Sequence, residues 1–216
     1  WQLVGGLSRD QRKTLEAQEY ASSTGLFDQP TADSHATNGQ AALLWQYRAS
    51  GKLHLSGSDR TRFPTMFERF SSRFGGAISN PGLKPERALN LELGIEDDLS
   101  PGWHGTATLF HSQVKDAIQS VNIDYNGSTY SQSQNVGEAT YRGLELALSA
   151  TLTPTLAWGG NYSYVVTSLD NPNDATVRLT TTPRNKALLW ARWQPTPELS
   201  VMPNLEYSGA RWSSAA

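Results

Sequence analysis

Apolar and polar residues alternate with a two-residue period along most of the chain. Residues 89–96 and 144–149 show this period most clearly, because every second side chain is aliphatic. The aliphatic positions of these two segments are Leu89, Leu91, Leu93, Ile95, Leu144, Leu146 and Leu148. Successive side chains of a β-strand point to opposite faces, so this period predicts strands with one apolar face. Glu92 and Glu145 lie on the opposite, polar face.

Weaker forms of the same period extend this prediction to about nine strands. The nine predicted strands, including the two clearest ones, lie near residues 1–9, 40–48, 53–56, 88–98, 103–118, 144–149, 156–167, 185–194 and 201–207. The sequence therefore predicts an all-β fold, in which the strands form an antiparallel up-and-down meander.

The connections between these strands alternate between short and long. The short ones are rich in Gly or Pro and the long ones are polar; in chain order, starting with a long one, they are 10–38, 49–52, 60–87, 99–102, 119–135, 153–155, 168–184 and 194–198. A transmembrane β-barrel has this layout, with short periplasmic turns and long extracellular loops. Several strands also reach the roughly nine to eleven residues that a tilted strand needs to cross a bilayer.

Alternation alone does not say which face is dry, so two other classes stay open. A soluble extracellular β-sandwich binding module would bury the apolar face and expose the polar one. A passive porin or an adhesin-type barrel would share the strand rhythm. Strand length, the alternating loop lengths and aromatic residues near strand ends favour a membrane barrel over the sandwich.

The amino-acid composition by itself gives no sign of a membrane protein, and it argues against several kinds of partner and site. Mean hydropathy is -0.49 and 18% of the 216 residues are charged, which is ordinary for a soluble protein. No apolar run approaches the roughly 18 to 20 residues of a spanning helix. A net charge of -2 argues against nucleic acid as a partner. The absence of Cys excludes disulfides and thiolate metal sites.

Two boxes before the strand at residue 89 resemble those of TonB-dependent outer-membrane receptors. Residues 62–70 read Arg-Phe-Pro-Thr-Met-Phe-Glu-Arg-Phe, and residues 80–86 read Asn-Pro-Gly-Leu-Lys-Pro-Glu. In that family, similar boxes flank one extracellular loop of the barrel. A third match, Tyr-Arg-Gly-Leu-Glu-Leu, covers residues 141–146. The matching motif residues are Phe63, Pro64, Glu68, Arg69, Asn80, Pro81, Leu83, Pro85, Glu86, Gly143 and Glu145.

The resemblance implies a barrel of about 22 strands, plugged by an N-terminal domain. Such receptors lie in the bacterial outer membrane and import a scarce ligand with energy from TonB, and a ferric siderophore or similar metal chelate is the ligand we expect. Residues 1–216 would be part of the barrel, without the plug and without the final strand or strands. The expected partners are outer-membrane lipid, lipopolysaccharide, the chelate and, through the plug, the TonB complex. The aliphatic positions given above would then face lipid.

Cationic and aromatic residues crowd two of the expected loops. They are Arg62, Phe67, Arg69, Phe70, Arg73 and Phe74 in one loop, and Tyr125 and Tyr130 in another. Such side chains can hold an anionic, ring-bearing ligand by charge-assisted hydrogen bonds and stacking. The alternative is that they pack loop against loop or contact lipopolysaccharide phosphates. For the prolines of the second box, the alternative is a purely structural role, because proline stops strand pairing and stiffens a loop.

Catalytic and metal chemistry find no support in the sequence. His54 and Ser56 share one face of a strand, as in outer-membrane phospholipases, but the Asn-Gly that follows the serine in that family is replaced here by Gly57 and Ser58. His104 and His111 are an odd number of residues apart, so they face opposite sides of their strand and cannot share a metal ion. We therefore expect no enzyme, no metal site and no cofactor.

Overall fold

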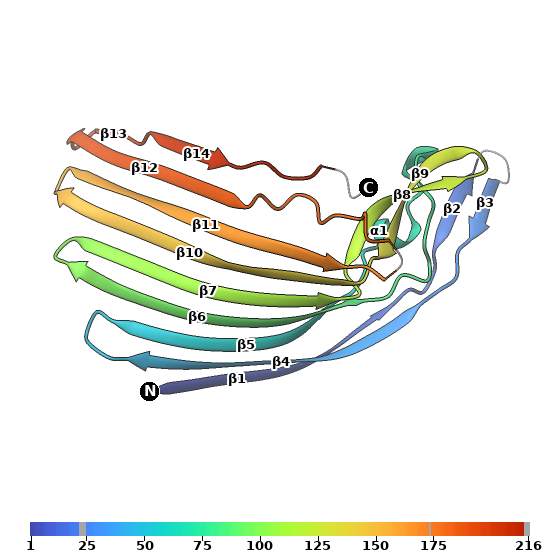
Figure 1. The fold of residues 1–216 in the computed structure, drawn as a ribbon, viewed down its shortest axis with the longest axis horizontal. Coiled ribbons are helices and arrows are strands. Elements are labelled where there is room, and N and C mark those ends of the chain that lie inside the picture. Colours follow the sequence, from blue (N-terminus) through green and yellow to red (C-terminus); the bar gives the residue numbers. More distant parts are fainter. Residues whose placement is uncertain (22–24, 173, 214–216) are drawn as a thin grey trace.

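The structure, a computed structural model, describes residues 1–21, 25–172 and 174–213, and its main feature is one antiparallel sheet (Figure 1). Strands that follow one another in the sheet also follow one another along the chain, apart from hairpins inserted in two long loops. The sheet strands are β1 (Gln2–Lys13), β4 (Asp33–Gln46), β5 (Lys52–Arg62), β6 (Glu86–Ser100), β7 (Trp103–Lys115), β10 (Glu138–Thr153), β11 (Leu156–Asp170), β12 (Asn185–Thr196), β13 (Leu199–Val201) and β14 (Asn204–Ser208). None of the described helices is long and apolar enough to cross a membrane.

The antiparallel meander of about nine strands is confirmed. β13 and β14 both pair with β12 and are separated by Met202 and Pro203, so they act as one interrupted strand. Proline has no N–H for the ladder, which explains the interruption. β6 has 15 residues and β10 has 16, well above the five or six usual in soluble sheets. All these long strands lie in a single sheet, which does not fit the two stacked layers of a sandwich.

Short turns gather at one end of the sheet and long connections at the other, as the sequence predicts (Figure 1). We call these the turn end and the loop end. The loop end carries two hairpins and two short helical segments: β2 (Gln18–Ala21) with β3 (Gly25–Asp28), β8 (Ile118–Tyr125) with β9 (Ser128–Asn135), α1 (Met66–Phe70) and η1 (Arg73–Gly75).

Several predicted boundaries differ from the structure: β5 and β10, for example, extend well beyond the expected 53–56 and 144–149. Two further regions differ as follows. The connection expected at 10–38 is shorter, because β1 continues to Lys13 and β4 already begins at Asp33. The strand expected at 103–118 ends at Lys115, because Asp116 has a φ of 53° in the left-handed region and turns the chain into the next hairpin.

The strand register sorts the side chains onto two faces. Leu93 lies opposite Leu55 on one neighbouring strand and opposite Leu109 on the other, and Leu109 lies opposite Leu144. We call this side the leucine face. The aliphatic positions predicted from the sequence all lie on it, with Leu89, Leu91, Leu93 and Ile95 between 40% and 49% exposed. The opposite side carries Glu92 and Glu145 and is called the glutamate face.

Aromatic rings line the turn end of the leucine face. Trp103 meets Trp158 edge to face, with ring centroids 5.7 Å apart. Trp1 stacks on Trp45 at 5.0 Å. This is where an interfacial aromatic girdle is expected in a membrane barrel.

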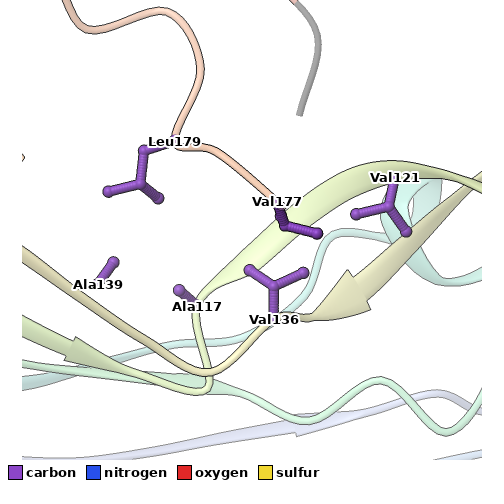
Figure 2. Close-up of a cluster of buried hydrophobic side chains, with 6 residues drawn as sticks. All are labelled: Ala117, Val121, Val136, Ala139, Val177 and Leu179. Atoms are coloured by element: carbon purple, nitrogen blue, oxygen red, sulfur yellow. The ribbon is translucent and has the colours of Figure 1, made fainter. Parts of the chain in front are cut away.

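The buried apolar cluster lies at the loop end instead of on either sheet face (Figure 2). Val177 and Leu179, from the segment between β11 and β12, pack over small side chains at the base of the β8–β9 hairpin. The other members are Ala117, Val121, Val136 and Ala139. The hydrophobic effect therefore joins the long connections to one another, while the leucine face keeps its aliphatic side chains exposed.

Candidate ligand-binding loops

The first box forms a capped helical turn. The hydroxyl of Thr65 accepts a hydrogen bond from the Glu68 amide at 3.1 Å, and the Glu68 carboxylate accepts one from the Thr65 amide at 2.7 Å. This capping box satisfies amide groups that a helix start leaves without partners, so five residues suffice for α1. The Thr-x-x-Glu spacing of the box is thus a folding signal.

Arg62 joins the two boxes through carboxylates. Its guanidinium donates to Glu68 at 3.0 and 2.9 Å and also to Glu86. The second oxygen of Glu86 accepts a hydrogen bond from the Ile118 amide at 2.6 Å, which ties β6 to β8. Burial by itself raises the pKa of Glu68, but the bonds from Arg62 and Thr65 outweigh it and hold that pKa below its usual range. The Arg62 charge is therefore already engaged within the loop.

Arg69 and Phe70 are buried, at 6% and 8% exposure. Arg69 donates from Nη2 to the Leu83 carbonyl at 2.7 Å, whereas its Nε has no partner among the described residues. Burial, with a smaller contribution from the nearby Arg12, lowers the pKa of Arg69. Arg12 itself donates to the Pro64 carbonyl at 2.9 Å. In this conformation these groups hold the loop together.

The second box is fastened to the β8–β9 hairpin. The Asn80 side chain donates to the Ser133 carbonyl at 2.9 Å, and Asn135 exchanges two hydrogen bonds with the Lys84 backbone, at 2.9 and 3.1 Å. Leu83 is almost fully buried at 2% exposure. β6 begins directly after Pro85. These contacts support the structural role weighed for this box.

Two aromatic groups remain on the surface of the loop end. Phe67 is 58% exposed and lies beneath the Arg73 guanidinium, 5.3 Å from its ring centroid. Tyr125 is 55% exposed and meets Tyr130 edge to face at 6.4 Å. Arg73 also donates to the Ser131 hydroxyl at 3.3 Å, which brings the two loops together. The side chain of Phe74 lies outside the described part of the structure.

A cavity of about 440 Å³ at the loop end was not foreseen from the sequence. Arg184, Arg211 and Trp212 line it together with Leu179, and the Thr181 amide donates to the Trp212 carbonyl at 3.0 Å beside it. These residues come from two separate parts of the chain that show no motif. Only folding brings the two arginines and the indole to one place.

In the third motif, residues 141–146, a side chain at position 143 would not fit, so a glycine stands there. A Cβ at Gly143 would lie 2.1 Å from the Tyr164 carbonyl oxygen and 2.8 Å from the Phe110 ring. Glu145 is exposed on the glutamate face, opposite Thr108. The close packing of β10 against β11 and Phe110 therefore requires a glycine at position 143. The exposed Glu145 carboxylate is available for contacts on the glutamate face.

The histidines lie as the two-residue period predicts. His104 is on the glutamate face, 2.9 Å from Asp98, and His111 is on the leucine face, opposite Leu91. A metal ion cannot bridge this pair through the sheet.

The whole chain, residues 1–216, matches the family described as TonB dependent receptor-like, beta-barrel. An iron-regulated outer membrane virulence protein of Vibrio cholerae is 30% identical over 144 residues, 62% of this chain and 22% of that protein. A ferric enterobactin receptor of Pseudomonas aeruginosa is 33% identical over 143 residues, 60% of this chain and 18% of that protein. The matched regions thus span about a fifth of these relatives.

Solved structures show the same fold. The copper transporter OprC superposes with a TM-score of 0.72 at 19% identity, over 94% of this chain and 31% of that one. The ferric-catecholate import receptor Fiu of Escherichia coli, in its closed form, gives 0.69 at 19% identity, over 96% of this chain and 32% of that one.

Proposed function

The chain belongs to the family of TonB-dependent receptor β-barrels, and from that premise we propose that it is part of the wall of an outer-membrane importer. The family match over all 216 residues carries the proposal. The leucine face meets the lipid, and the loop end lies outside the cell. The glutamate face lines the lumen, where Glu92 and Glu145 face the plug.

A ferric siderophore or a similar anionic metal chelate is the proposed cargo. The relatives include a ferric enterobactin receptor, and an iron-regulated protein is also similar. Exposed Phe67, Arg73 and Tyr125 can supply stacking and positive charge to a ring-bearing anion. The cavity beside Arg184 and Arg211 offers the same chemistry close to the lumen.

Transport rather than catalysis follows from the family, which consists of receptors and transporters. TonB would supply the energy through contact with the plug. The passive porin alternative is not favoured, because the family match over residues 1–216 describes TonB dependent receptors.

The ligand proposal predicts that the exposed side chains of Arg73 and Tyr125 contact the chelate. The buried side chains of Arg69 and Phe70 should not contact it. In the intact receptor, Arg73→Ala and Tyr125→Ala should each weaken ferric enterobactin binding by about tenfold, as expected for loss of one charge-assisted bond or one stacked ring. Titration of the purified receptor with ferric enterobactin measures this. Arg192→Ala, which removes an exposed cation on the glutamate face away from the loops, is the matched control and should bind normally.

A ferric hydroxamate titrated in parallel tests the chelate class. Equal affinity of both loop variants and the parent would refute the assignment of Arg73 and Tyr125.

A further inference from the structure

Two of the long connections are bound to each other along their length and form one body, which we call the loop unit. It comprises residues 63–85, which include most of both boxes, and residues 117–136, which include the β8–β9 hairpin. The Ile78 amide donates to the Ser131 carbonyl at 2.9 Å, and the Ser131 amide donates back to the Gly76 carbonyl at 3.2 Å. The first connection therefore runs parallel beside β9 at this point.

Side chains extend this contact to the base of the hairpin. Those of Arg73, Asn80 and Asn135 each form hydrogen bonds between the two connections. The side chains proposed to meet the chelate, Phe67, Arg73 and Tyr125, all belong to this body. Their position over the lumen therefore depends on how the loop unit is held against the sheet.

The β8–β9 hairpin joins the sheet through two residues with left-handed backbone. Asp116 follows β7 and Gly137 precedes β10, and their φ values are 53° and 104°. At these two residues the hairpin leaves the direction of the sheet strands (Figure 1). A few residues at the ends of secondary-structure elements are enough to serve as a hinge. A further contact is needed to fix the angle of the loop unit.

Glu86, the first residue of β6, supplies a contact of this kind and bonds in two directions. One carboxylate oxygen accepts a bond from the Arg62 guanidinium, at the end of β5, and the other accepts one from the Ile118 amide at 2.6 Å, at the start of β8. Arg62 in turn donates to Glu68 in α1. The Glu86 side chain is only 15% exposed, so water competes weakly for these bonds. Both parts of the loop unit are thus connected to the edge of the sheet through one carboxylate.

We propose that Glu86 is a positioning residue for chelate binding. It holds the loop unit at the angle at which Phe67, Arg73 and Tyr125 face the chelate. The carboxylate itself does not touch the cargo, because both of its oxygens are engaged within the protein. The inference rests on the proposed function, since it concerns how these three side chains meet a chelate.

Titration of the purified intact receptor with ferric enterobactin tests this role. Glu86→Ala removes both bonds and should weaken binding by about tenfold. Glu86→Gln loses the charge, but its amide oxygen can still accept a bond from Ile118, so the loss should be only about threefold. This milder variant also keeps the test available if Glu86→Ala does not assemble.

Asp59→Asn is the matched control. Asp59 accepts two bonds from Arg87, both at 2.7 Å, and this ion pair joins the same two strands, β5 and β6. In the described part of the chain the pair has no bond to the loop unit. Asp59→Asn should therefore bind ferric enterobactin as the parent does.

A distance measurement separates positioning from a general loss of structure. Residues 1–216 contain no Cys, so in an intact receptor with any other cysteine replaced, spin labels can be placed by Ser128→Cys and Ser168→Cys. Ser128 is exposed in the hairpin and Ser168 is exposed on β11. Double electron–electron resonance should give one narrow distance distribution for the parent and for Asp59→Asn, and a broader one for Glu86→Ala. The heat-modifiable mobility of all three should be the same, because the sheet is intact.

Binding of ferric enterobactin by Glu86→Ala as tight as by the parent would overturn the positioning role. Weaker binding with an unchanged distance distribution would also overturn it, because Glu86 would then act without moving the loop unit. Absence of ferric enterobactin binding by the parent itself would instead refute the proposed cargo. In that case the distance comparison alone would decide whether Glu86 holds the loop unit.

Discussion

A Leu146→Arg variant of the intact receptor is expected to fail to assemble stably in the outer membrane. Leu146 lies on the leucine face, opposite Ala107 and Tyr162. Ala107 is four residues beyond Trp103, so this level is about 10 Å above the girdle and close to the middle of the apolar band. An arginine there costs roughly 2 to 4 kcal/mol. The measurement is the fraction of membrane-inserted receptor that shows the heat-modifiable mobility of a folded barrel.

The same substitution one residue along provides the control. Ala147 lies on the glutamate face, opposite Thr106 and Asn161, so Ala147→Arg should assemble normally. Leu91→Arg should have a milder effect than Leu146→Arg, because Leu91 lies opposite His111, which is four residues and about 10 Å farther from the girdle than Ala107. Normal assembly of Leu146→Arg together with failure of Ala147→Arg would mean that the lipid and lumen faces have been exchanged.

Adding one methyl group at Gly143 is expected to destabilise the barrel strongly. The new Cβ of Gly143→Ala would lie within 2.1 Å of a backbone carbonyl oxygen, which cannot move without disturbing the β10–β11 ladder. Overpacking of this kind costs about 1 to 3 kcal/mol. Denaturant unfolding of the intact receptor in detergent should therefore show a lower midpoint.

Gly5→Ala is the control for Gly143→Ala. Its Cβ would meet only the Gln40 carbonyl oxygen, at an ordinary 3.7 Å, so its midpoint should match that of the parent. Matching midpoints for the two variants would show that β11 and Phe110 have room to move.

The sheet followed from the sequence because its signal is local. Each strand repeats the two-residue period, and the register that joins Leu55, Leu93 and Leu109 needs only that apolar positions share one face. The turns carry their own signals: Asn126 and Gly127 have φ values of 51° and 78°, as the two-residue turn of the β8–β9 hairpin requires.

The loops did not follow in the same way, because their packing depends on residues far apart in the sequence. Nothing near Arg69 indicates that it will be buried against Leu83, and nothing near Asn135 indicates that it will bind the Lys84 backbone. Two residues proposed as ligand contacts, Arg69 and Phe70, therefore turned out to lie inside the loop.

The central claim is that this chain forms part of the barrel of an importer of ferric chelates driven by TonB. The most direct test is accumulation of radioactive iron, supplied as ferric enterobactin, by cells whose only receptor for it is the intact protein. Uptake should be saturable in cells with TonB and fall to the background of receptor-free cells when TonB is deleted, while binding at the surface persists. Uptake that is equal with and without TonB, or that rises in proportion to concentration without saturating, would contradict the account and indicate a passive pore.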